Sequence, residues 1–85
     1  MPEISRFLGI VISIYYNEHN PPHFHAQYGE FQITIEIESG IVVGKFPRRA
    51  LEAVLDWYEI YKKELMIDWE LAIKGKPLNK INPLE

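Results

Sequence analysis

The 85-residue chain contains no cysteine. This absence excludes disulfide bonds, zinc sites built from thiolates and cysteine nucleophiles. A metal ion would therefore have to be held by histidine, aspartate or glutamate side chains. The chain also has no glycine-rich phosphate loop, no serine-nucleophile motif and no pair of aspartates, so common sequence signatures of nucleotide-binding and hydrolytic enzymes are missing.

Basic charge is scarce in the first half of the chain. The net charge is −3, and residues 1–44 carry one base, Arg6, against five acids, whereas residues 45–85 carry eight bases against seven acids. Sequence-independent binding to nucleic acid usually needs a basic face, and only Lys45, Arg48 and Arg49 form a tight basic cluster. We therefore expect no general DNA binding, while a local contact with an RNA phosphate stays open.

Long hydrophobic runs are absent as well. The apolar run at residues 8–16 is too short to span a bilayer, and residues 1–6 lack the basic start and apolar stretch of a signal peptide. We expect a cytoplasmic protein without a membrane partner. The length and the hydrophobic fraction of 47% predict one domain over residues 1–85, small enough that self-association would add useful stability.

The first half of the chain alternates apolar and polar residues with a period of two, which predicts strands. We expect four of them, at residues 10–17, 23–28, 31–38 and 41–45. Gly29-Glu30 lies between the second and third, and glycine at the first central position is typical of a type II′ hairpin turn. These strands predict an antiparallel meander.

The second half changes to the period of a helix, with Pro47 suited to its first turn. A single helix over residues 47–74 would be about 40 Å long, so we expect a break near residues 61–64. The predicted fold is α+β, with four antiparallel strands and two C-terminal helices packed on one face. The predicted core comprises Ile12, Ile14, Phe24, Ile33, Ile35, Leu51, Val54, Leu55 and Trp69.

All three histidines, His19, His23 and His25, lie within seven residues. On a strand, His23 and His25 share one face, and the hairpin register places His23 opposite Glu36. Two imidazoles and a carboxylate could bind Zn²⁺, Fe²⁺ or Ni²⁺, so His23, His25 and Glu36 form a candidate metal site. Two other interpretations stay open: a solvated face on which the histidines pair with Glu36 and Glu38, and a catalytic or anion-binding role.

A second candidate site is the basic cluster at the start of the predicted helix. Arg48 and Arg49 oppose the helix dipole, which favours acids in the first turn. With Lys45 they could hold a phosphate or a partner's carboxylate, or they could pair within the chain with Glu52, Asp56 or an acid of the sheet. We expect at least one arginine to be exposed and free of an internal carboxylate. Tyr15, on the polar face of the first predicted strand, is a further candidate contact for a ligand or partner.

Several motifs resemble those of the small bacterial family named domain of unknown function 4160. They are Pro-Pro-His-Phe-His at residues 21–25, Pro-Arg-Arg-Ala-Leu at 47–51, and shorter matches at 1–7, 28–29, 69–70 and 81–84. The resemblance implies a role beside another small protein, as in toxin–antitoxin-like pairs. It supplies no catalytic residue.

We therefore expect an accessory or interaction domain rather than an enzyme, acting with a partner encoded nearby or with a second copy of itself, and without a cofactor. One alternative is a metal-independent ribonuclease toxin, in which His23 and His25 act as acid and base while Arg48 and Arg49 hold the phosphate. The other is a small protein that binds a divalent transition metal through His23, His25 and Glu36.

Overall fold

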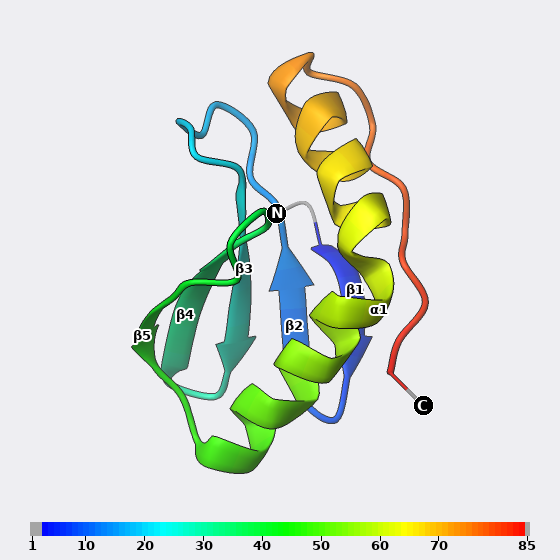
Figure 1. Ribbon diagram of the computed structural model, residues 1–85. Helices are drawn as coiled ribbons and strands as arrows, with labels where there is room; N and C mark the ends of the chain where they lie inside the picture. Colours follow the sequence, from blue (N-terminus) through cyan, green and yellow to red (C-terminus); the bar gives the residue numbers. More distant parts are fainter. Residues whose placement is uncertain (1–2, 85) are drawn as a thin grey trace.

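Five strands joined in sequence order form one antiparallel sheet, and a long helix covers one of its faces (Figure 1). This computed structural model describes residues 3–84, so the predicted motif residues Met1 and Pro2 and the last residue, Glu85, lie outside the described part. The α+β class is as predicted. The elements are β1 (Glu3–Phe7), β2 (Ile10–Ser13), β3 (His23–Tyr28), β4 (Phe31–Glu36), β5 (Val42–Lys45) and α1 (Arg48–Ile73).

The prediction of four strands is wrong, because β1 precedes them. The chain reverses at Leu8 and Gly9, which have φ values of +52° and +77°, and Phe7 then pairs with Ile10. Gly9 suits this turn, but leucine rarely adopts a positive φ, so Leu8 at the first turn position hid the hairpin. The strand predicted over residues 10–17 also ends early, at Ser13, where the chain leaves the sheet.

The prediction of two helices is also wrong, although the expected break is visible as a kink. Tyr61 has non-helical angles, with φ −111° and ψ 23°, inside the otherwise continuous α1. Figure 1 shows the helix bending about halfway along its length. Neither glycine nor proline interrupts this region, so the helix resumes after one distorted residue instead of ending. Among residues 3–84, no helix is both long enough and apolar enough to cross a membrane.

The β3–β4 hairpin follows the predicted register. Tyr28 pairs with Phe31 across the turn, and His23 pairs with Glu36 at the far end. Gly29 has a φ of +59°, as its turn position requires. Phe24 and Ala26 are fully buried beneath the helix, whereas His23 and His25 alternate with them and point to the other side of the strand.

Gly44, on β5, is the glycine with the least room for a side chain. Its φ is +113°, and a Cβ atom built there would lie 2.7 Å from the carbonyl oxygen of Gln32 on β4. We expect Gly44→Ala to destabilise the fold by roughly 1–2 kcal/mol, because the backbone must shift as well as strain. Gly29→Ala is the matched control, since Gly29 also has a positive φ but has no atom within 4 Å of such a Cβ. Urea denaturation should show a larger loss of unfolding free energy for Gly44→Ala than for Gly29→Ala. Equal losses would contradict the close approach of Gly44 to the Gln32 carbonyl oxygen.

The core lies between the sheet and both halves of α1, and its helical side is centred on aromatic rings. Trp57 is fully buried, and its ring lies 5.5 Å from that of Phe7 and 5.9 Å from that of Phe24. Leu51 and Leu55, predicted as core, are only partly buried. The buried face of α1 is therefore rotated about the helix axis, away from these leucines and toward Trp57 and Tyr58. The other predicted core residues are buried: Ile12, Ile14, Phe24, Ile33, Ile35, Val54 and Trp69.

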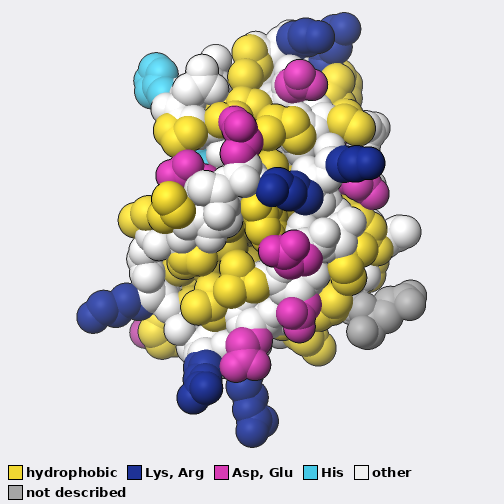
Figure 2. All heavy atoms as spheres, viewed as in Figure 1, with side chains coloured by type: hydrophobic (Ala, Val, Ile, Leu, Met, Phe, Trp, Pro, Cys, Tyr) yellow, Lys and Arg dark blue, Asp and Glu magenta, His cyan; other side chains and the backbone are white. Residues whose placement is uncertain are grey.

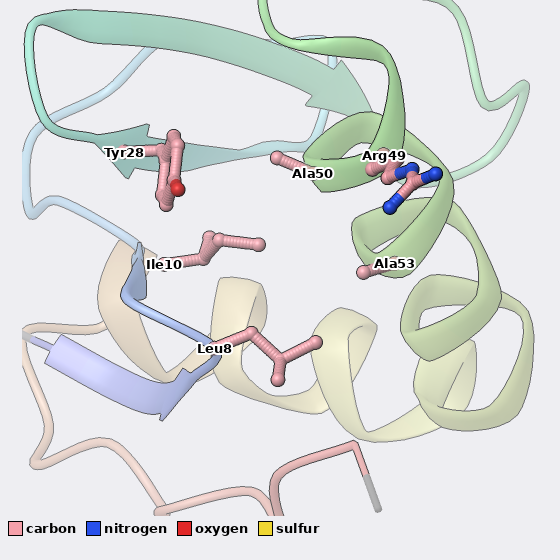
Figure 3. A pocket seen from close by; sticks show the side chains of 6 residues that line it. All are labelled: Leu8, Ile10, Tyr28, Arg49, Ala50 and Ala53. Atoms are coloured by element: carbon pink, nitrogen blue, oxygen red, sulfur yellow. The ribbon is translucent and has the colours of Figure 1, made fainter.

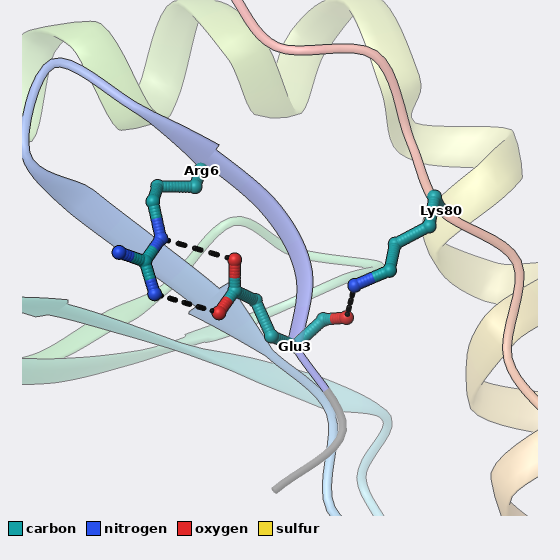
Figure 4. Close-up of polar contacts among 3 residues, drawn as sticks. All are labelled: Glu3, Arg6 and Lys80. Atoms are coloured by element: carbon teal, nitrogen blue, oxygen red, sulfur yellow. Dashed lines mark hydrogen bonds and ion pairs between the residues drawn. The ribbon is translucent and has the colours of Figure 1, made fainter.

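The segment after α1 runs back along the helix and reaches β1 (Figure 1). The Ile81 N–H donates to the Ile4 carbonyl at 2.7 Å, and Lys80 Nζ donates to the Glu3 carbonyl at 2.8 Å. Figure 4 shows this contact beside the paired Arg6 and Glu3 side chains. Trp57 Nε1 donates to the Asn82 carbonyl at 2.8 Å, so the tail is tied to both the helix and the sheet.

A buried carboxylate also holds this tail. Asp68, on the second half of α1, is fully buried, and its Oδ1 accepts the Asn79 N–H at 2.9 Å. Its Oδ2 has no hydrogen-bond partner among the described residues. Burial raises the pKa of Asp68, and the Asn79 N–H offsets this only in part.

Candidate functional site

The loop between β2 and β3 folds back so that one of its carboxylates meets both strand histidines. His25 Nε2 donates to Glu18 Oε1 at 2.7 Å, and His23 Nε2 lies 3.5 Å from the same oxygen. One ligating atom from each of the three residues lies within 4.8 Å of the others. This cluster of Glu18, His23 and His25 is called the loop triad below.

Backbone contacts fix which nitrogen His23 presents to the cluster. Its Nδ1 lies 2.8 Å from the Pro21 carbonyl, and a carbonyl oxygen can only accept a hydrogen bond. The neutral ring therefore carries its proton on Nδ1 and turns the Nε2 lone pair toward Glu18. A backbone carbonyl that orients an imidazole in this way is the usual outer support of a metal-binding or proton-transferring histidine.

Aromatic rings surround the two imidazoles and limit their movement. The Tyr15 ring meets His25 edge-on at 4.5 Å, and the Trp69 ring of α1 lies 5.2 Å from His23. Both histidine side chains are more than four-fifths buried, with exposures of 18% and 16%. His25 Nδ1 is buried without a hydrogen-bond partner in the described part of the chain. The triad is therefore a partly enclosed site with fixed rings.

The Glu18 carboxylate is stabilised in its charged form. The hydrogen bond from His25 lowers the pKa of Glu18, partial desolvation opposes this, and the positive charge that His23 and His25 carry only when protonated lowers it further. An ionised carboxylate and two imidazole nitrogens can together provide the ligand atoms for a cation. The same carboxylate can also accept a proton.

The model of the family described as Domain of unknown function (DUF4160) matches residues 9–70. The chain belongs to this family. No curated protein and no solved structure matches it. The matched span contains the loop triad and both arginines of the DUF4160 domain, whereas β1 and the tail after α1 lie outside it.

Glu36 does not join the histidines in this DUF4160 domain. It pairs with His23 in backbone register, but its carboxylate accepts a hydrogen bond from Ser39 at 3.1 Å. The carboxylate beside the two histidines is that of Glu18, not that of Glu36 as predicted. It was missed because loop residues have no periodicity from which to place a side chain. The available signal was a carboxylate shortly before the paired histidines, separated from them by two prolines that turn the chain.

The basic cluster lies at the other end of the DUF4160 domain. Figure 1 shows α1 beginning near the end of β3, whereas the histidines lie at the start of that strand. Arg48 Nε lies 3.5 Å from Glu52 Oε1, which agrees with the interpretation that this arginine pairs within the chain. Arg49 is exposed and has no carboxylate partner among residues 3–84. The arginines and histidines of one chain therefore do not form the combined site that the ribonuclease alternative requires.

Proposed function

We propose that this DUF4160 domain is a small cytoplasmic bacterial module that binds a divalent transition metal ion through Glu18, His23 and His25. The supporting observation is the convergence of three ligating atoms within 4.8 Å. Two imidazoles and one carboxylate suit Zn²⁺, Fe²⁺ and Ni²⁺. Such a set provides three ligands and leaves a position for water or a bound molecule.

The spacing of the triad suits an ion with modest adjustment. Ligands around a tetrahedral zinc ion lie about 3.4 Å apart when the bonds are about 2.1 Å long. The distance of 3.5 Å between His23 Nε2 and Glu18 Oε1 is close to this value. The 2.7 Å hydrogen bond from His25 to Glu18 would open by about 0.7 Å as the ion replaces the proton. Because Glu18 lies on a loop, it can make that movement.

A second candidate function is partner binding, as one component of a toxin–antitoxin-like pair. The observation in favour is Arg49, an exposed cation without an internal carboxylate among the described residues, beside a cavity whose other lining residues are apolar or aromatic. The two functions use opposite ends of the molecule. A partner could therefore bind at one end while the triad holds its ion at the other.

Titration calorimetry on tag-free, chelator-treated protein with Zn²⁺ or Ni²⁺ tests the metal proposal. We expect one ion per chain at neutral pH and weaker binding at acidic pH, because protons compete for the imidazole nitrogens. Glu18→Gln and His25→Gln should each weaken binding by at least about 10–100-fold, because each removes a ligand and even the loss of a residue that only supports a ligand has an effect of this size. The ion should also change tryptophan fluorescence, because the His23 ring lies 5.2 Å from that of Trp69.

Two matched variants serve as controls for this titration. His19→Gln removes an exposed histidine of the same loop, and Glu36→Gln removes the carboxylate bonded to Ser39. Both should bind the ion as the parent does. Failure of the parent to bind either ion would refute the proposal, and so would equal losses in the Glu18→Gln and Glu36→Gln variants.

A further inference from the structure

A small cavity lies at the end of the sheet opposite the loop triad. Its volume is about 180 Å³. Figure 3 shows side chains from the β1–β2 turn, the end of β3 and the first turns of α1 facing it. The lining residues are Leu8, Ile10, Tyr28, Arg49, Ala50 and Ala53.

Leu8 lies at the rim of this cavity in an unfavourable state. Its backbone has a φ of +52°, and its side chain is 71% exposed. A left-handed conformation costs a non-glycine residue about 1–2 kcal/mol, and asparagine or glycine would fit this turn position better. Because the Leu8 side chain is exposed, it buries little apolar surface within the chain, and this burial does not offset the free-energy cost of the backbone strain. Strained residues are concentrated at binding sites, where a contact with another molecule supplies the compensation.

Arg49 is the one charged residue of the lining. It is exposed and has no carboxylate partner in residues 3–84, whereas its neighbour Arg48 faces Glu52. Figure 2 shows lysine and arginine side chains projecting at the lower end of the molecule, where Figure 1 places the start of α1. The charge at the cavity is therefore complementary to an acidic ligand.

We propose that this cavity docks an acidic peptide segment of a partner protein. One apolar side chain of the segment enters between Leu8, Ile10 and Tyr28, and a neighbouring carboxylate pairs with the Arg49 guanidinium. The volume supports a single side chain, because pockets for small-molecule ligands usually span about 300–1,000 Å³ and this one is smaller. The inference deepens the partner role proposed above and is independent of the loop triad.

Amide chemical shifts of the full ¹⁵N-labelled chain test this assignment. The probe is acetyl-Gly-Leu-Glu-Gly-amide, and its isosteric partner carries Gln in place of Glu. We expect saturable shifts at Leu8, Arg49 and Ala53 with the Glu probe, and binding about tenfold weaker with the Gln probe, because a charge-assisted pair is lost. Absence of shifts at the cavity overturns the proposal, as does equal binding of the two probes.

Three variants separate this site from general effects of charge and folding. Arg49→Gln should weaken binding of the Glu probe about tenfold, whereas Arg48→Gln, with the same charge change one residue away, should leave it within about twofold. Leu8→Asn should weaken binding while its denaturation midpoint stays equal or rises, since asparagine tolerates the positive φ. Equal effects of the two arginine variants would refute the assignment. All three variants should bind metal as the parent does, so failure here is distinguishable from failure of the metal proposal.

Discussion

Replacing Trp57 by alanine is expected to destabilise the domain by about 3–5 kcal/mol, the usual range for a large aromatic residue in a core. The side chain is fully buried and contacts the rings of Phe7, Phe24 and Tyr61. Its Nε1 also donates to the Asn82 carbonyl. The substitution therefore removes packing between helix and sheet and one attachment of the tail. A domain of this size has a total stability of about 5–10 kcal/mol, so much of the fold's margin is lost.

The measurement is chemical denaturation followed by circular dichroism, with Leu55→Ala as the matched control. Leu55 lies two residues earlier on the same helix but is only partly buried, so its truncation should cost clearly less. If Leu55→Ala destabilised as much as Trp57→Ala, the helix would have to pack with a different face toward the sheet.

Replacing Asp68 by asparagine is expected to stabilise the domain by about 1–3 kcal/mol at pH 8. The carboxylate is fully buried, and its Oδ2 lacks a hydrogen-bond partner among the described residues. Keeping a charge in such a place is costly. Asparagine has nearly the same shape, and its Oδ1 can still accept the Asn79 N–H. The substitution therefore removes the charge and retains the attachment of the tail.

The gain should depend on pH in a defined direction. Burial raises the folded-state pKa of Asp68 above its ordinary value, so folding favours the protonated form. Its contribution to stability is fully present below the unfolded pKa, near 3.9, and is lost as the pH rises through the raised folded pKa. Urea denaturation at pH 4 to pH 8 should show that the midpoint of Asp68→Asn exceeds that of the parent by an amount that increases with pH. Asp56→Asn, at an exposed position of the same helix, should show no such trend, and a gain largest at pH 4 would contradict the burial argument.

Glu18 acts in the opposite sense on the pH dependence. Its hydrogen bond from His25 lowers the folded-state pKa, so its contribution is present above the unfolded pKa and is lost as the pH falls through the lower folded value. The parent should therefore lose stability in acid through Glu18. The two carboxylates shift stability in opposite directions as the pH changes, which allows single substitutions to distinguish them.

The β3–β4 hairpin could be predicted from the sequence because three signals agree there. Strict alternation, Gly29 at the turn and the burial of Ile33 and Ile35 all specify one register. The kink at Tyr61 was likewise expected, from the length limit on a straight helix. In both cases a local pattern and a global constraint gave the same answer.

The features that escaped prediction depend on contacts between distant residues. The turn at Leu8 breaks the usual preference for glycine or asparagine, so β1 was missed. Glu18 reaches the histidines from a loop whose path follows no period. The face of α1 that packs on the sheet is the one bearing Trp57, because large rings fill the space above Phe24. The periodicity of the sequence does not encode this choice of face. The histidine positions could be predicted, but their carboxylate partner could not.

The attachment of the tail to β1 also limits how copies of the domain can associate. At the start of the β1 edge, the Ile81 N–H and Lys80 Nζ donate to the carbonyl oxygens of Ile4 and Glu3. The β5 edge pairs only with β4 and bears the exposed side chain of Val43. Two copies joined through their β5 edges would form a ten-stranded sheet with a tail across each outer edge. The tail contacts at Glu3 and Ile4 would then disfavour further strand addition at the outer edges, and so disfavour growth into a fibre.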